Sequence, residues 1–277
     1  MSIEVVELWK RFRATLALKG VTASFGNGLN VVLGPNGSGK STLLMIMAGL
    51  LKPSKGRVSF LGVDPWRDPR FVHENCSMYL EDSGLPQWMK GIDLLKSIPQ
   101  VDWDRVERLS KDLSVESYWR RYIFTYSSGM AKKIALMACL CKDAKVYILD
   151  EPFTNLDAAA INAIVSVLGE LSRSSTVIVA THVIPPRLSE LISKLVILVD
   201  GSKVFDSSER SYLKSLRCPY SEKYLDAAMS AIRAGKAKEI TVTGEEVLIR
   251  GVSRDLAIEG CRELVDIELA YREALQG

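Results

Sequence analysis

The chain alternates between short, wholly apolar runs and longer segments in which apolar residues recur at helical spacing. Runs of strand length lie at residues 29–33, 58–61, 146–149, 176–180 and 195–199. Short continuous runs are typical of strands buried on both faces, and helical patterns lie between several of them. The pattern therefore predicts an α/β protein with a mostly parallel sheet covered by helices.

The pattern changes between about residue 72 and residue 142. This stretch combines helical spacing, polar turns and three tryptophans, and only residues 78–80 look like a strand. A segment of this kind between strands of one sheet predicts a helical insertion within the α/β domain.

The pattern changes again after Asp206. A helical stretch comes first, and residues 239–250 then alternate in a way that predicts a hairpin turning at Gly244. Residues 254–275 are expected to form a closing helix. We therefore expect a main domain over residues 1–205 and a small α+β appendage over residues 206–277.

Composition narrows the class of protein. The chain is 47% hydrophobic and 25% charged, as in an ordinary globular protein. Its 36 basic and 33 acidic residues give a net charge of only +3. This balance lacks the basic face that nucleic-acid binding requires, so no nucleic-acid partner is expected.

The cysteine pattern favours reduced thiols in the core over a metal site. The number is odd, no Cys-x-x-Cys pair occurs, and the chain has only two histidines. The five residues are Cys76, Cys139, Cys141, Cys218 and Cys261.

Neither a membrane span nor a secretion signal is expected. No apolar run reaches the length of about 18 residues that a spanning helix needs. The first residues alternate acidic with apolar side chains and do not form the basic and apolar regions of a signal peptide. We expect a cytoplasmic protein.

A glycine-rich loop of the Walker A pattern follows the run at residues 31–33 and precedes a helical pattern. Glycines let the chain turn tightly and direct successive N–H groups at a phosphate, and the helix N-terminus adds its positive pole. Lys40 is expected to reach the β and γ phosphates of ATP, and Ser41 to bind Mg²⁺. The residues expected to bind ATP here are those of the loop, Gly34, Pro35, Asn36, Gly37, Ser38, Gly39, Lys40 and Ser41, and Thr42 directly after it.

Two carboxylates end the apolar run at residues 146–149. Ligands of α/β sheets bind at the carboxyl ends of the strands, so Asp150 and Glu151 are expected beside the phosphate loop. Asp150 suits the shell of Mg²⁺, and Glu151 is placed to polarise the attacking water or to take its proton.

Residues 126–130, which read Tyr-Ser-Ser-Gly-Met, resemble the signature of ABC ATPases. With the phosphate loop, the acidic strand end, residues 154–157 and His182 in order, residues 1–205 resemble the ATP-binding subunit of an ABC transporter. The resemblance implies a P-loop NTPase (RecA-like) core, an antiparallel N-terminal β subdomain and the helical insertion. The signature departs from the commonest form, with Ser128 in place of a glycine and Met130 in place of a glutamine.

The family resemblance also implies a shared site. Two chains would pack head to tail as a homodimer or heterodimer, with Ser127 and Gly129 of one reaching the γ phosphate held by the other. Asp157 resembles the aspartate that contacts the opposing subunit, and His182 the histidine that senses the γ phosphate. Ser127 is also expected to cap the following helix. The resemblance makes Lys40, Glu151 and His182 the candidate catalytic residues.

Two further positions are assigned by resemblance. Phe12 corresponds to the aromatic residue that lies against adenine, with Trp9 as the alternative. Glu81 stands where the family usually carries the glutamine of the coupling loop, and Gln87 is the alternative. Glu81 joins Ser41 and Asp150 as a candidate ligand of Mg²⁺.

These features favour an ATPase that drives separate transmembrane permease subunits from the inner face of the cell membrane. Residues 85–89 form an apolar patch that either receives a helix of such a subunit or packs inside the insertion. Residues 264–275 resemble the end of export-type subunits and favour export. The alternative is a soluble ABC ATPase such as an iron–sulphur assembly partner; a P-loop kinase lacks support because no acceptor pocket or lid is evident.

Overall fold

The computed structural model describes residues 2–81, 84–207, 214–243, 245–253 and 256–265. A six-stranded sheet forms its centre, with the strand order β5-β6-β7-β3-β8-β9. All neighbours in it are parallel except β8 and β9. The strands are β3 (Gly28–Leu33), β5 (Cys76–Tyr79), β6 (Val146–Asp150), β7 (Thr176–Thr181), β8 (Ile192–Val199) and β9 (Ser202–Asp206).

The apolar runs of this sheet are continuous because both of its faces are buried. Alternate residues of β7 point to opposite faces, so Val177 and Val179 join one core while Ile178 and Ala180 join the other. The first core is covered by α5 (Ser128–Leu140) and α6 (Ala158–Leu171), and the second by α1 (Lys40–Met47). The predicted mostly parallel, two-faced sheet is confirmed.

A second sheet packs against α1 and is antiparallel throughout, with the order β2-β1-β4. Its strands are β1 (Ile3–Phe12), β2 (Thr15–Phe25) and β4 (Lys55–Phe60), and α2 (Pro69–Asn75) follows β4 along the chain. Most of the run at residues 58–61 thus falls in β4, and the antiparallel N-terminal β subdomain implied by the family resemblance is confirmed. The apolar content of the run does not reveal whether its neighbours are parallel or antiparallel.

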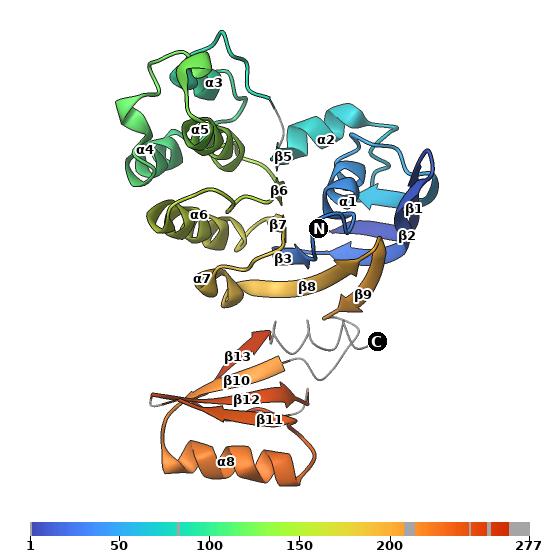
Figure 1. The fold of residues 1–277 in the computed structure, drawn as a ribbon, viewed down its shortest axis with the longest axis vertical. Helices are drawn as coiled ribbons and strands as arrows, with labels where there is room; N and C mark the ends of the chain where they lie inside the picture. The colour runs from blue at the N-terminus through green and yellow to red at the C-terminus, as the bar shows by residue number, and fades with distance from the viewer. Residues whose placement is uncertain (1, 82–83, 208–213, 244, 254–255, 266–277) are drawn as a thin grey trace.

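The helical insertion lies at one end of the central sheet, beside β5 and β6 (Figure 1). It contains α3 (Gly91–Lys96), α4 (Trp103–Asp112), the 3₁₀ turns Val115–Ser117 and Ile123–Thr125, and α5. Asp102 and Ser127 accept hydrogen bonds from the first turns of α4 and α5, at 2.9 and 3.3 Å. The expected capping role of Ser127 is confirmed.

The C-terminal unit lies at the opposite end of the molecule, below β8 (Figure 1). One helix, α8 (Glu222–Arg233), covers an antiparallel sheet of order β11-β12-β10-β13. The strands are β10 (Lys214–Pro219), β11 (Glu239–Val242), β12 (Glu246–Val252) and β13 (Arg262–Val265). The unit has its own core, which includes Leu216, Ala228, Val247 and Ile249.

The hairpin expected over residues 239–250 is confirmed as β11 and β12, although Gly244 lies outside the described residues. The closing helix expected over residues 254–275 is wrong where it can be compared, because Arg262–Val265 pairs with β10 as a strand. Over so short a stretch, the apolar and charged residues fit both the helical and the strand periodicity. Pairing with the available edge of the sheet therefore decides that a strand forms. Residues 254–255 and 266–277 lie outside the described residues.

The expectation of five reduced cysteines is wrong for two of them. Cys218 on β10 and Cys261 before β13 form a disulfide, while Cys76, Cys139 and Cys141 are buried free thiols. The disulfide partners are 43 residues apart in sequence, so only the strand pairing brings them together.

No helix among the described residues is long and apolar enough to cross a membrane.

Candidate functional site

The phosphate loop lies between the end of β3 and the start of α1. Gly37 and Gly39 have φ values of 79° and 96°, in the left-handed region where a side chain is strained. A Cβ atom on Gly39 would lie 2.5 Å from the carbonyl oxygen of Ala17. The glycines are therefore required for the tight loop, which directs its amides and the N-terminus of α1 toward one cleft.

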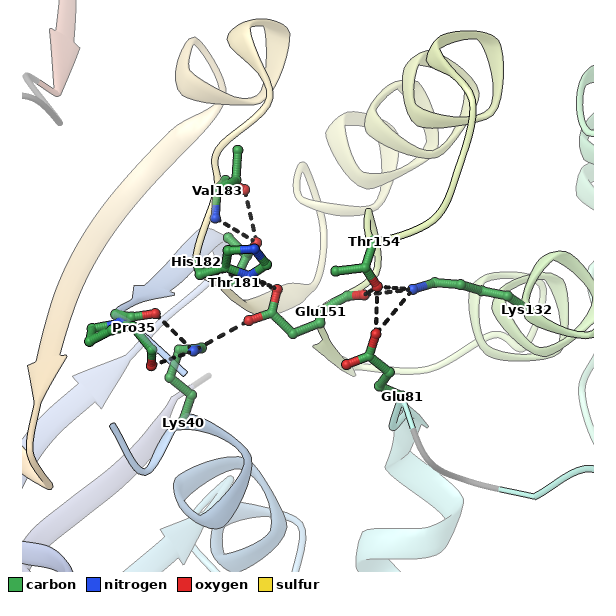
Figure 2. Close-up of polar contacts among 10 residues, drawn as sticks. Pro35, Lys40, Glu81, Lys132, Glu151, Thr154, Thr181, His182 and Val183 are labelled. Atoms are coloured by element: carbon green, nitrogen blue, oxygen red, sulfur yellow. Dashed lines mark hydrogen bonds and ion pairs between the residues drawn. The ribbon is translucent and has the colours of Figure 1, made fainter. Parts of the chain in front are cut away.

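Lys40 is the first residue of α1 and is only 5% exposed. Its Nζ donates to the carbonyl oxygens of Gly34 and Pro35, at 2.8 and 3.1 Å. The same Nζ lies 3.3 Å from Oε1 of Glu151, forming a buried ion pair (Figure 2). The loop thus holds a buried positive charge directly opposite the end of β6.

Glu151 links Lys40 to His182. Its other carboxylate oxygen, Oε2, lies 2.9 Å from Nδ1 of His182 and accepts the His182 amide at 3.3 Å (Figure 2). This arrangement follows from topology, because β6 and β7 are adjacent parallel strands whose carboxyl ends meet at one sheet edge. Of the candidate catalytic residues, all three are therefore in one chain of contacts.

Asp150 is 5% exposed and precedes Glu151. Burial raises the pKa of its carboxyl, and the charges of Glu151 and Glu81 raise it further, whereas a hydrogen bond from Ser41 and the charge of Lys40 lower it. Its Oδ1 has no hydrogen-bond partner within the described part of the chain. A buried, unpaired carboxylate oxygen beside a serine hydroxyl and a second carboxylate fits a divalent cation.

A cleft of about 230 Å³ joins these groups. Three residues outside the loop and α1 contribute to it: Ala17 on β2, Glu81 after β5, and Glu151 after β6. Its lining residues are Ala17, Asn36, Gly37, Gly39, Lys40, Ser41, Thr42, Glu81 and Glu151. Of the candidate metal ligands, Ser41 and Glu81 line the cleft, and Asp150 does not line it but shares a hydrogen bond with Ser41.

Glu81 contacts a second cluster at the edge of the cleft. Its Oε1 accepts from Oγ1 of Thr154 at 2.6 Å and lies 3.7 Å from Nζ of Lys132 (Figure 2). Lys132 also donates to the Glu151 carbonyl oxygen at 2.9 Å and to Thr154 Oγ1. Burial lowers the pKa of Lys132, while the carboxylates of Glu81 and Glu151 act in the opposite direction.

Sequence reasoning missed Lys132. It lies one turn into α5, where the sequence alone shows it as one of two adjacent lysines on an otherwise apolar helix. Its counterpart Glu81 was a candidate, but the sequence separation of the two hides their contact. The alternative coupling residue, Gln87, is exposed and donates to the Leu85 carbonyl oxygen at 3.1 Å, lining a neighbouring cleft with Glu81 and Lys132.

The signature residues lie away from the phosphate loop of their own chain. Ser127 is exposed at the start of α5, Gly129 follows it, and neither lines the 230 Å³ cleft. Asp157 caps α6 through the Ala160 amide at 2.8 Å and pairs with Lys133 at 3.0 Å. A single chain therefore does not bring these three candidates to its own phosphate loop.

Phe12 ends β1 and is 43% exposed, with Nζ of Lys10 4.9 Å from its ring centroid. The alternative, Trp9, packs beside Gly20 and lines a different cleft with Arg11 and Leu16. Phe12 thus keeps the more open ring, although it does not line the cleft of the phosphate loop.

Comparison with known proteins gives a consistent result. The family model described as ABC transporter matches residues 18–154. A probable sulfate/thiosulfate import ATP-binding protein of Chlorella vulgaris is 34% identical over 210 residues, covering 73% of this chain and 89% of the relative. A putative ABC transporter ATP-binding protein of Pyrococcus horikoshii is 29% identical over 223 residues, covering 76% and 85%.

Solved structures agree at the level of the fold. The ATP-binding subunit of an ABC transporter superposes with a TM-score of 0.67 at 23% identity, over 75% of this chain and 90% of that one. A dimeric ATP-binding cassette bound to ADP and phosphate gives 0.65 at 20% identity, over 76% and 100%.

Proposed function

This chain belongs to the ABC transporter family of ATP-binding ATPases, and on that premise we propose that it hydrolyses MgATP as a head-to-tail dimer that drives separate transmembrane subunits. The contact chain from Lys40 through Glu151 to His182 carries the proposal. It places a cation, a carboxylate and an imidazole around the point where a γ phosphate would lie beyond the glycine-rich loop.

Each of the three side chains has its own role in the proposed hydrolysis. Phosphate oxygens compete with Glu151 for Nζ of Lys40, because both are anions that bind the same ammonium group. Oε1 of Glu151 is then released to accept a proton from the attacking water, while Oε2 stays held by Nδ1 of His182. His182 therefore orients the carboxylate and places its ring beside the transferred phosphate.

The residues suited to Mg²⁺ are Asp150, Ser41 and Glu81, which combine a buried unpaired oxygen, a hydroxyl and a second carboxylate. Magnesium in nucleotide sites is usually held by one or two carboxylates and by the phosphates. When bound, it would neutralise charge on the β and γ phosphates.

Dimerisation is proposed because Ser127 and Gly129 lie outside the cleft of their own chain. The amides at the start of α5 form an anion site, which a phosphate held by a second chain would complete. The solved cassette dimer of similar fold supports this arrangement, and Asp157, exposed at the start of α6, is placed to contact the second chain. The partner is a second copy or a related ATPase chain.

An aromatic patch is the proposed docking surface for a helix of the transmembrane subunit. Trp88, Tyr122 and Phe124 are 77%, 47% and 66% exposed, and the rings of Tyr122 and Phe124 stack at 5.8 Å. Backbone hydrogen bonds join residues 87–89 to residues 123–124, so the segment that carries Trp88 lies beside the one that carries Phe124. Leu85, in contrast, packs against the core. Docking there would place the protein peripherally on the cytoplasmic face of the membrane.

We propose export as the direction of transport. The support is the resemblance of residues 264–275 to the ends of export-type subunits; residues 266–275 of this segment lie outside the described part. Import is the printed function of the Chlorella relative and belongs to that protein. ATP-driven uptake into inside-out vesicles carrying the complex would support export, and uptake into right-side-out vesicles would contradict it. The soluble iron–sulphur alternative is not favoured, since the relatives carry transport names.

Light scattering of Glu151→Gln protein with and without MgATP tests the shared site. The amide cannot take the proton, so ATP should be retained and a dimer should accumulate. Ser127→Arg in the same background should abolish this dimer. Ser117→Arg is the matched control, because Ser117 is exposed in the same insertion, before α5. The proposal would be contradicted by a protein that binds ATP but forms neither a homodimer nor a heterodimer with a co-expressed ATPase chain.

A further inference from the structure

The C-terminal unit contacts the main domain through ion pairs to one carboxylate, that of Glu190. This residue follows α7 (Pro186–Ser189) and immediately precedes the segment that enters β8. Nη1 of Arg217, on β10, lies 3.3 Å from its Oε1, and Nη1 of Arg262, on β13, lies 3.1 Å from its Oε2. Each oxygen of a single carboxylate is therefore bound by a different strand of the C-terminal sheet.

The two arginines are direct cross-strand partners, Arg217 opposite Arg262. Like charges at such positions repel, so this pairing is unfavourable unless an anion lies between them. Glu190 supplies that anion, and Nε of Arg217 also lies 3.4 Å from Oε2 of Glu246. The disulfide between Cys218 and Cys261 joins the residues next to the two arginines and keeps their strands together. Arg217 and Arg262 together form a binding site for the Glu190 carboxylate.

Glu190 is connected to His182 by a short and constrained segment. Pro185 and Pro186 fix two backbone torsions, and Leu188 of α7 is fully buried in the main core. The Leu188 amide donates to the Pro185 carbonyl oxygen at 2.9 Å, and the Leu191 amide to that of Leu188 at 3.0 Å. Residues 183–189 therefore form a short, held connection between His182 and Glu190.

We propose that Glu190, held by Arg217 and Arg262, is a positioning residue that sets the place of the His182 segment, so that the C-terminal unit governs turnover at the ATP site. This inference rests on the proposed ATPase function. The ion pairs are partly exposed, with Glu190 at 35%, Arg217 at 37% and Arg262 at 60%, so their contribution to global stability is small. Their effect should appear in the local order of residues 183–191 and in turnover.

Hydrogen exchange and steady-state kinetics of Glu190→Gln, and of Arg217→Gln with Arg262→Gln, test the inference on the full chain. Exchange of peptide 183–191 should become faster, while exchange of the phosphate loop stays unchanged. The kcat for MgATP should fall by roughly three- to tenfold with KM unchanged. Combined with His182→Ala, Glu190→Gln should cause no further loss of kcat, because it acts through that residue.

Glu170→Gln is the matched control. It removes an ion pair between Arg108 of α4 and Glu170 of α6, also partly exposed at 59% and 40%, that does not involve α7. Its exchange at residues 183–191 and its kcat should equal those of the wild type. Unchanged exchange in Glu190→Gln would overturn the inference whatever the ATPase activity, and so would faster exchange with an unchanged kcat. A wild-type chain that fails to hydrolyse MgATP would instead overturn the proposed function.

Discussion

Glu81 and Lys132 offset one another within the site. Glu81 adds a carboxylate close to Asp150 and Glu151, and the cation that faces it is Lys132, whose side chain is 9% exposed. Without such a partner, three carboxylates near one point would repel each other. The pair explains how the chain accommodates the Glu81 carboxylate beside the other two.

Lys132→Met should lower kcat/KM for MgATP by roughly tenfold, because it leaves the Glu81 carboxylate without its cation. Adding Glu81→Gln should restore much of the loss, since the uncharged amide needs no cation. The measurement is steady-state ATPase kinetics on both single variants and the double variant. Losses that simply add would show that the two residues act independently.

The three free thiols should be inert in the folded protein. Burial raises the pKa of Cys76, Cys139 and Cys141 to about 12. At pH 8 about one thiol in ten thousand would be ionised, and the thiolate is the reactive form. Alkylation with iodoacetamide followed by mass spectrometry should leave all three unmodified until the chain is denatured. Rapid modification of any of them in the native protein would contradict this.

At the scale of elements, the helix starts follow rules that are readable in the sequence. Asp68, Asp102, Ser127 and Asp157 each accept a hydrogen bond from an amide in the first turn of the helix they precede. Such side chains satisfy backbone donors that lack intrahelical partners. This local chemistry is why the start of α5 could be expected from the sequence.

The disulfide stabilises the pairing of β10 with the segment that leads into β13. It closes a loop of 43 residues, for which the chain-entropy model gives about 4 kcal/mol. Replacing Cys218 and Cys261 with serine should therefore destabilise the C-terminal unit by about 2–4 kcal/mol. Urea denaturation measures the loss in free energy of unfolding, with the unfolding of the C-terminal unit followed by hydrogen exchange of α8 and β12. Exchange of β6 and β7 is the control and should not change.

At the scale of the whole molecule, the C-terminal sheet and α8 have a core separate from the two cores of the main domain. We therefore propose two folding units, divided near residue 206. The Glu190 contacts that join them are partly exposed ion pairs, and we expect these to be too weak to merge the two units into one cooperative transition.

Calorimetry should accordingly show two unfolding transitions. MgATP with the Glu151→Gln variant should stabilise only the main domain, by about 2.7 kcal/mol at a ligand concentration of 100 times Kd. The transition of the C-terminal unit should stay in place and should shift when dithiothreitol reduces its disulfide. A single transition that moves as a whole with MgATP would show one cooperative unit.

The sequence by itself determined the phosphate loop, the acidic end of β6 and the apolar strands of the central sheet. These features are local: glycine torsions, the order of residues along one strand and burial on both faces all appear in short stretches of chain. The motif order was also sufficient to indicate the family. The cap of α5 and the hairpin of β11 and β12 are local features of the same kind, and the sequence predicted both.

Only the tertiary structure decided which distant residues meet. The Lys132 contact with Glu81, the Cys218–Cys261 disulfide, the antiparallel partners of β4 and the arginines around Glu190 all join segments far apart in the chain. Their pairing depends on which strand edges and helix faces remain available after the sheets have formed. Local propensity does not contain that information, which is why residues 262–265 were expected in a helix and form a strand.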